Sequence, residues 1–258
     1  MFKKVIFLLI LSFLTVSSCR TVNSNGHETS VNDILPRTSF LFIHKLIKIY
    51  MCTDNICTAP KVWNAYGSGA VIHNNDAGSF ILTAAHVCLN SQVDTEYLKY
   101  KSSFSVTSFD GEKFTAEIIN YDKKIDACIL YAKGLDVKSV KFANRSPEPG
   151  DKVYNVAAPL GIFNPGSIPI LEGRYIGIAN WGAALYSIPA APGSSGSPVF
   201  NHEGRLIGMI YAVYEKFDTV SISVTYEELK AFLNITLKDY KLYGKKGCSC
   251  NHDIAHNN

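Results

Sequence analysis

The stretch Ala191-Pro192-Gly193-Ser194-Ser195-Gly196-Ser197-Pro198-Val199-Phe200 decides how the rest of the sequence is interpreted. Its glycines and small residues lead directly into an apolar segment. This composition lets a backbone fold sharply around one side chain and present its own N–H groups. Taken alone, such a run is often only a loop between two strands. Its meaning therefore depends on what the rest of the chain provides.

Two other segments supply what a hydrolytic site needs. Thr83-Ala84-Ala85-His86 lies upstream, and Ile125-Asp126-Ala127 lies between it and the glycine-rich stretch. A serine hydroxyl is a weak nucleophile at neutral pH and needs a neighbouring base, and an imidazole base needs a group that orients it. The sequence therefore indicates Ser195 as nucleophile, His86 as base and Asp126 as orienting carboxylate. This order along the chain disfavours an α/β-hydrolase, in which the serine comes first and the histidine last.

With these residues, the chain resembles the trypsin-like serine peptidases of the chymotrypsin fold, in their compact bacterial form, over residues 41–233. Gly193-Ser194-Ser195-Gly196-Ser197-Pro198 corresponds to the family's Gly-x-Ser-Gly-Gly-Pro and departs from it at Ser197. The resemblance implies an all-β fold of two six-stranded antiparallel β-barrels with a C-terminal helix. It also implies an oxyanion hole formed by the backbone N–H groups of Gly193 and Ser195.

Short strand-like segments separated by turn residues agree with a barrel or a sandwich. Asp126 belongs to one of them, where an uncompensated carboxylate would be costly. From composition alone an exposed aspartate is the simpler interpretation, and Asp122 is the alternative carboxylate. Thr225 and Glu228 form a capping-box pattern that predicts a closing helix. The predicted strands, the first of them assigned on the resemblance, are 40–51, 65–72, 80–83, 104–107, 114–119, 125–131, 152–157, 173–178, 185–188, 198–201, 205–214 and 219–224.

The resemblance also indicates where a substrate would bind. The primary pocket should lie between the residues before the nucleophile, including Ala190, and the strand Tyr211-Ala212-Val213, which should pair with the substrate backbone. The residues around Ala190 include no acid, so a preference for Arg or Lys would lack its counter-charge. Val213 stands where a glycine often keeps the pocket open, which favours small or medium apolar side chains. Ser194 stands where many relatives carry an acid that pairs with a new N-terminus, so we expect activity without zymogen cleavage.

The N-terminus has the features of an export signal. Lys3 and Lys4 precede an apolar run over residues 5–16 that is too short for a comfortable membrane span. The run ends in Val16-Ser17-Ser18-Cys19, which resembles a bacterial lipobox. We therefore expect a signal peptide over 1–18 and a lipid on Cys19, with an ordinary signal peptide or an uncleaved anchor as alternatives. The expected location is a bacterial cell membrane, the periplasm or the extracellular space.

The resulting organisation has four parts. After the signal peptide, a lipidated cysteine and a flexible polar tether occupy 19–38. The protease domain spans 39–235, with one barrel at 39–144 and the other at 145–235. A polar, basic tail covers 236–258.

The cysteines fit an exported protein, because an even number remains when the lipobox cysteine is set aside. Cys52 and Cys57 flank a turn-like insert and suit a disulfide across a hairpin. Cys88 and Cys128 each follow a proposed triad residue by two positions. A bond between them and two buried free thiols are equally compatible with the sequence.

Composition limits the other classes of function. The chain has 258 residues, 47% of them hydrophobic, which is enough for one large core or two small barrels. Without Lys3 and Lys4 it carries 23 basic and 22 acidic residues, so nucleic-acid binding has no electrostatic support. Cys248-Ser249-Cys250 with His252 and His256 is a weak metal candidate, and we expect neither a metal nor a cofactor. The expected partners are a polypeptide substrate and, through the lipid, a membrane, with the chain as a monomer.

Two other functions share these features. A binding protein at the cell envelope that keeps the fold without effective catalysis would tolerate the departure at Ser197, and an esterase would use the same triad. An intact set of His86, Asp126 and Ser195 favours catalysis. The function predicted is therefore a serine endopeptidase that forms an acyl-enzyme.

Overall fold

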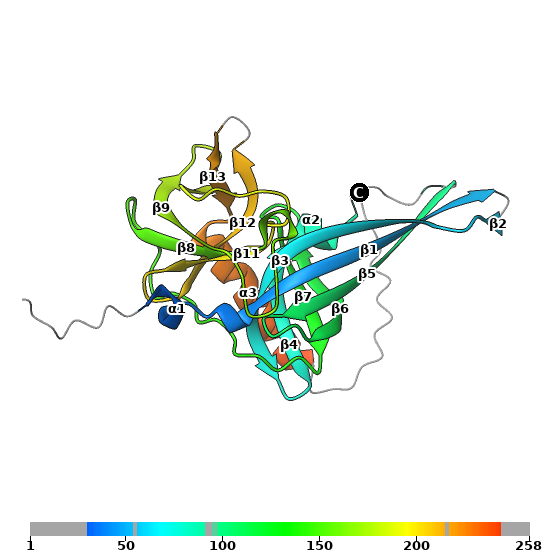
Figure 1. Ribbon diagram of the computed structural model, residues 1–258, viewed down its shortest axis with the longest axis horizontal. Helices are drawn as coiled ribbons and strands as arrows, with labels where there is room; N and C mark the ends of the chain where they lie inside the picture. The colour runs from blue at the N-terminus through cyan, green and yellow to red at the C-terminus, as the bar shows by residue number, and fades with distance from the viewer. Residues whose placement is uncertain (1–29, 54–55, 91–94, 96, 215–216, 244–258) are drawn as a thin grey trace, which may run out of the picture.

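A computed structural model of the chain describes residues 30–53, 56–90, 95, 97–214 and 217–243. Two β-barrels lie side by side in it, one from each half of the chain (Figure 1). The predicted signal peptide, Cys19 and the Cys248–Cys250 segment lie outside the described residues. Within them, no helix has the length and apolar character needed to cross a bilayer.

The first barrel uses the N-terminal strands. They follow the order β1-β3-β4-β7-β6-β5, and pairing between β1 and β5 closes the sheet, while β2 adds to the edge of β1. Alternate apolar side chains of these strands point inward and form one core. The strands are β1 (Phe40–Thr53), β2 (Ile56–Cys57), β3 (Lys61–Asn75), β4 (Gly78–Ala84), β5 (Leu98–Ser108), β6 (Lys113–Asp122) and β7 (Ala127–Lys133).

The second barrel closes in the order β10-β13-β12-β11-β8-β9. Tyr186, Ile188 and Val199 belong to its separate core. The prediction of two six-stranded antiparallel barrels is therefore confirmed. The strands of this barrel are β8 (Lys152–Val156), β9 (Ile170–Ile178), β10 (Ala184–Tyr186), β11 (Ser197–Asn201), β12 (Leu206–Tyr214) and β13 (Phe217–Ser223).

The closing helix α3 (Tyr226–Tyr243) begins at the predicted capping box. The Thr225 hydroxyl donates to Glu228 Oε2 at 2.6 Å, and the Glu228 N–H donates to Thr225 Oγ1 at 3.3 Å. The helix continues to Tyr243, so the predicted boundary at residue 236 between the domain and the tail is too early in the chain. Thr236 explains why this part of the helix packs on the domain, because its side chain is buried and its hydroxyl accepts a hydrogen bond from Asn120 Nδ2 at 2.9 Å.

The segment before the first barrel also differs from its prediction. A flexible tether was expected as far as residue 38, but the chain forms α1 (Val31–Ile34) and the 3-10 turn η1 (Arg37–Ser39). Leu35 between them is buried in the first core. A Cβ atom on Gly204 would lie 2.2 Å from the carbonyl oxygen of Ile34, so this segment also lies against the second barrel. Apolar residues within a polar stretch therefore fix its last part to the protein.

β1, β3 and β5 are longer than predicted and extend together from the first barrel to a tip that carries β2 (Figure 1). We call residues 45–53, 56–66 and 98–103 the β-arm. Pairing of β1 with β3 runs out to Ile49 opposite Lys61, and pairing with β5 runs to Met51 opposite Leu98. The predicted Cys52–Cys57 disulfide is present and joins β1 to β2. The β-arm is therefore a three-stranded sheet with a covalently closed end.

Candidate active site

His86 and Asp126 are in direct contact between β4 and β7. His86 lies in the short helix α2 (Ala85–Cys88), directly after β4, and Asp126 lies in the turn directly before β7. The imidazole Nδ1 and the carboxylate Oδ2 are 2.7 Å apart. Asp126 Oδ1 also accepts the backbone N–H of His86 at 2.9 Å, and its carbonyl oxygen accepts that of Ala85 at 3.0 Å. Three contacts thus hold the carboxylate residue against the helix that carries the imidazole.

The backbone of Asp126 explains this arrangement. Its φ of 52° lies in the left-handed region, which aspartate tolerates better than most residues. The sequence placed Asp126 within a strand, but β7 begins at Ala127, and the intervening turn directs the carboxylate back toward α2. Asp122, the alternative carboxylate, instead accepts the N–H of Lys124 at 2.8 Å within the same turn. Asp126 is therefore the residue that the fold brings to His86.

A disulfide joins the two elements that carry this pair. Cys88, the last residue of α2, is bonded to Cys128 in β7. Of the two alternatives that the sequence left open, the bond is the one observed. Since each cysteine follows His86 or Asp126 by two residues, the link restrains both neighbours of the imidazole–carboxylate contact.

The loop of Ser195 reaches the same place from the second barrel. The Ser68 N–H donates to the carbonyl oxygen of Ser195 at 2.8 Å. A Cβ atom on Gly67 would lie 2.9 Å from Val87 Cγ1 and 3.2 Å from that same oxygen, so Gly67 lies between α2 and the Ser195 backbone. The partly exposed Ser195 hydroxyl makes no hydrogen bond to any described residue. The structure thus places the serine loop beside α2 without a serine–imidazole hydrogen bond, a bond that is often long in unliganded enzymes.

Ser68 fixes this loop through its side chain as well. Its buried hydroxyl donates to the carbonyl oxygen of Gly193 at 2.8 Å and accepts the N–H of Ala158 at 3.1 Å. Gly193 has a φ of 98° and lies so close to Ala158 that a Cβ atom would be 2.4 Å from its carbonyl oxygen. Among the described residues, neither the Gly193 N–H nor the Ser195 N–H has an acceptor. Both donors are thus available, as an oxyanion hole requires.

Ser197, which departs from the family pattern, has a specific partner. It begins β11 and is fully buried, and its hydroxyl accepts a hydrogen bond from Asn155 Nδ2 at 2.8 Å. The same Asn155 nitrogen also donates to the Pro198 carbonyl at 2.9 Å. A buried hydroxyl that has a hydrogen-bond partner lowers stability little, so Ser197 is compatible with the loop conformation.

The strand expected to hold the substrate has an open edge beside the serine loop. β12 pairs with β11 only as far as Ile210, opposite Ser197, whereas its pairing with β13 continues to Tyr214. Among the described strands, Ala212 and Val213 thus have a partner on one side only, and Tyr211 lies at the register shift between Ile210 and Ala212. Ala190, on the approach to the nucleophile, packs on the second core.

A cavity of about 500 Å³ lies on the β12 side of His86. It is lined by His86, Asp126 and Tyr211, together with the lysines that precede Asp126. Burial raises the pKa of the Tyr211 phenol, and the charge of Asp126 adds to this effect. Tyr211 is therefore a neutral hydrogen-bonding group in this cavity at neutral pH.

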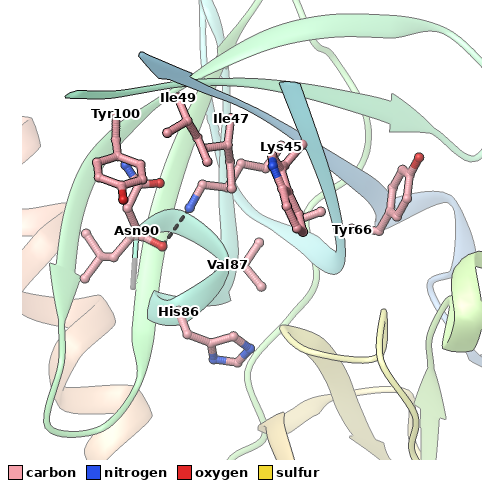
Figure 2. A pocket seen from close by; sticks show the side chains of 11 residues that line it. Lys45, Ile47, Ile49, Tyr66, His86, Val87, Asn90 and Tyr100 are labelled. Atoms are coloured by element: carbon pink, nitrogen blue, oxygen red, sulfur yellow. Dashed lines mark hydrogen bonds between the residues drawn. The ribbon is translucent and has the colours of Figure 1, made fainter. Parts of the chain in front are cut away.

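A second cavity of about 590 Å³, which we call the arm cavity, lies between His86 and the β-arm (Figure 2). Lys45 lines this cavity although a lysine side chain is rarely buried. The residue is only 3% exposed, and its ammonium donates to the Leu89 carbonyl at 2.6 Å and lies 5.7 Å from the centre of the Phe104 ring. Burial lowers the pKa of Lys45 to about 8.

Sequence reasoning identified neither Lys45 nor Ser68. A signal existed for Lys45, because it shares the alternating face of β1 with Ile43 and Ile47, where a lysine is out of place. For Ser68 there was none, since a serine between two glycines has no distinguishing pattern. In the described part of the chain, no group of three or more His, Cys, Asp or Glu side chains is placed to hold a metal ion.

Comparison with known proteins identifies the family of the chain. The family described as "Trypsin-like peptidase domain" matches residues 67–209. Serine protease HTRA1 of Xenopus laevis is 28% identical over 154 residues, which are 56% of this chain and 31% of that protein. A probable periplasmic serine endoprotease, DegP-like, of Hahella chejuensis is 25% identical over 61% of this chain and 32% of its own length. The chain thus spans about a third of the length of these curated relatives.

Among solved structures, the serine endoprotease from Yersinia pestis superimposes with a TM-score of 0.59 at 19% identity. The superposition covers 82% of this chain and 68% of that one. At this identity the likeness concerns the fold. It agrees with the two barrels described above.

Replacing Ser68 by alanine tests whether its hydroxyl holds the serine loop. The Ser68→Ala variant loses the hydrogen bonds to Gly193 and Ala158, so we expect the free energy of unfolding to fall by about 1–3 kcal/mol. We also expect a fluorophosphonate to label Ser195 about 10–100-fold more slowly, because the loop is displaced.

The control is Ser79→Ala, which removes an equally buried hydroxyl that donates to the Leu135 carbonyl within the first barrel. It should lower stability by a similar amount and leave the labelling rate as in the wild type. Equal labelling rates in Ser68→Ala and Ser79→Ala would contradict the assigned role of Ser68.

The lowered pKa of Lys45 predicts a pH-dependent change in stability. Below pH 8 the lysine is charged in both the folded and the unfolded chain, so the folded state bears the full cost of the buried charge. As the pH rises from about 8 toward the ordinary value of 10.5, only the folded state loses its proton, and the cost disappears. Lys45→Met should therefore be more stable than the wild type by about 1–3 kcal/mol at pH 7, with a smaller difference at pH 9.5. Urea unfolding at the two pH values measures this, and a difference independent of pH would contradict it.

Proposed function

The chain belongs to the trypsin-like peptidases, and from this membership we propose that it is a serine endopeptidase. The observation that carries the proposal is the His86–Asp126 contact of 2.7 Å, with the Ser195 loop held beside α2 through Gly67 and Ser68. Base, orienting carboxylate and nucleophile are the three groups that acyl transfer by a serine requires.

In the proposed reaction, Ser195 Oγ attacks the scissile carbonyl carbon while the Nε2 atom of His86 takes its proton. The imidazolium then gives this proton to the departing amine, which leaves an acyl-enzyme that water hydrolyses by the same route. Asp126 accepts from Nδ1, which fixes the tautomer with Nε2 available and stabilises the imidazolium. Its second oxygen, bonded to the His86 N–H, prevents rotation of the carboxylate.

The negative charge that develops on the carbonyl oxygen needs fixed donors. The N–H groups of Gly193 and Ser195 would supply them, because neither has an acceptor among the described residues. Two contacts support the loop in this conformation: the Ser68 hydroxyl on the Gly193 carbonyl, and the Leu160 N–H on the Pro192 carbonyl at 2.6 Å. Donors held in place before the reaction need no reorganisation as the charge forms.

We infer that no new N-terminus is needed to organise this loop. Ser194, in place of an acid, is buried, and its N–H donates to the Ala191 carbonyl at 2.9 Å. We likewise propose export and lipid attachment at Cys19, which the lipobox-like sequence and the name of the periplasmic relative support. Mass spectrometry of the mature N-terminus checks the lipid.

Labelling with a fluorophosphonate tests the proposed chemistry. The folded wild-type chain should react without prior proteolysis, and Ser195→Ala should not react. Asp126→Asn should react about 10³–10⁴-fold more slowly, because the imidazole loses its correct tautomer. Asp122→Asn is the matched control and should react like the wild type, since Asp122 only closes the adjacent turn. Absence of labelling in well-folded wild type would instead indicate a protein that keeps the fold without catalysis.

We propose that cleavage follows small or medium apolar residues. Ala190 lies on the apolar second core, Val213 occupies the open-edged part of β12, and Ser187-Ile188-Pro189-Ala190 contains no acid. The substrate backbone would add to the open edge of Tyr211, Ala212 and Val213 as an antiparallel strand. A peptide library should show Ala, Val or similar residues before the scissile bond. A profile dominated by Arg, Lys or Glu would contradict this assignment.

A further inference from the structure

The lining of the arm cavity is mostly apolar, and Lys45 is its one lysine, with His86 and Asn90 as further polar residues. β1 contributes Lys45 and Ile47, and β3 contributes Trp63, which lies opposite Ile47. β5 contributes Tyr100, which lies opposite Ile49 on the same face. Paired residues of antiparallel strands share a face, so these side chains form one platform on the β-arm. Trp63 stays 63% exposed, although a tryptophan is usually covered when a protein can cover it.

The position of the platform relative to the proposed reaction follows from His86. His86 lines both the arm cavity and the cavity of Tyr211 and Asp126, and no β12 residue lines the arm cavity. If β12 binds the acyl part of the substrate, the arm cavity lies on the other side of the imidazole. This is the side toward which His86 delivers a proton to the departing amine. The platform thus lies along the leaving part of the substrate.

Lys45 gives this cavity a charge. In Figure 2 its side chain lies among Ile47, Val87 and Tyr100, and the dashed line marks its bond to the Leu89 carbonyl. An ammonium has three N–H donors, and in the described part of the chain this is its one hydrogen bond; no described carboxylate forms an ion pair with it. A nearly fully buried cation of this kind usually has a negative partner.

We propose that the arm cavity binds the segment of the substrate that follows the scissile bond and that Lys45 selects a carboxylate in that segment. The inference rests on the proposed peptidase function and extends it to a substrate class. The apolar platform would hold the aliphatic part of the segment, and the ammonium would donate to the carboxylate. Leu89, whose carbonyl holds the ammonium, follows His86 by three residues and directly follows α2. A carboxylate one to three residues after the scissile bond is therefore within range.

Two sources can present this carboxylate: an Asp or Glu side chain, or the free C-terminus of the substrate. Three kinds of peptide separate them, all sharing the best acyl sequence from the library and differing only after the scissile bond. The first is amidated and carries Gln at each of three positions. The second replaces one Gln by Glu, position by position. The third keeps Gln and has a free C-terminus.

For the wild type we expect kcat/KM to rise about tenfold for Glu over Gln at one position, or for the free C-terminus over the amide. In Lys45→Met the same ratio should fall to about one. The matched control is Lys48→Met, which removes the same charge from the exposed, opposite face of β1 and should keep the wild-type ratio. Because each variant is compared with itself on two peptides, a general loss of activity does not affect the result.

The outcomes distinguish this inference from the function on which it rests. Hydrolysis of all three kinds of peptide at equal rates by the wild type overturns the assignment of Lys45 and leaves the peptidase proposal intact. A ratio that survives in Lys45→Met overturns it as well, and leaves Lys45 as a structural donor to the end of α2. If no peptide is cleaved and Ser195 is not labelled, both proposals fail together.

Discussion

The close approach of two backbones at the junction of the barrels is the constraint on which the site depends. β3 of the first barrel and the serine loop of the second touch through main-chain atoms, with the Ser68 N–H on the Ser195 carbonyl. Gly196 has a φ of 87°, and a Cβ atom there would lie 2.2 Å from the Ser68 carbonyl oxygen. Only glycine permits this contact. The Ser195 loop is thus positioned by the barrel that carries His86, and any displacement of one barrel against the other would change the geometry of the proposed reacting groups.

Much of this arrangement followed from the sequence, for reasons that particular residues make clear. The contact of His86 with Asp126 was predicted because a serine nucleophile needs an imidazole base and the base needs a carboxylate that orients it, and the resemblance assigned these roles to the two residues. The short apolar segments separated by turn residues predicted a barrel or a sandwich, and the resemblance to the trypsin-like peptidases selected two barrels. The tether and the tail were misjudged where single apolar or hydroxyl side chains, Leu35 and Thr236, find partners far away in the chain. Composition within a local window does not contain such partners.

The length of the β-arm is a second feature that the local sequence does not predict. Nothing in the local sequence distinguishes a strand that ends at the barrel from one that continues past it, and the pairing of β1 with β3 and β5 decides the matter. Once that register is known, Lys45 becomes conspicuous, because it occupies a position that its neighbours on the same face fill with isoleucine. A buried charge that lowers stability and lines the same cavity as His86 is a common mark of a functional role.

The bond between Cys88 and Cys128 gives the site a dependence that the triad alone would not have. In a reducing cytosol these thiols stay apart, and the two elements that carry the imidazole and the carboxylate are connected only by pairing of β4 with β7 and by the contacts of Asp126. An oxidising compartment adds the covalent connection. The restraint on the His86–Asp126 contact therefore depends on the redox surroundings in which the chain folds, and only an oxidising compartment gives it covalent support.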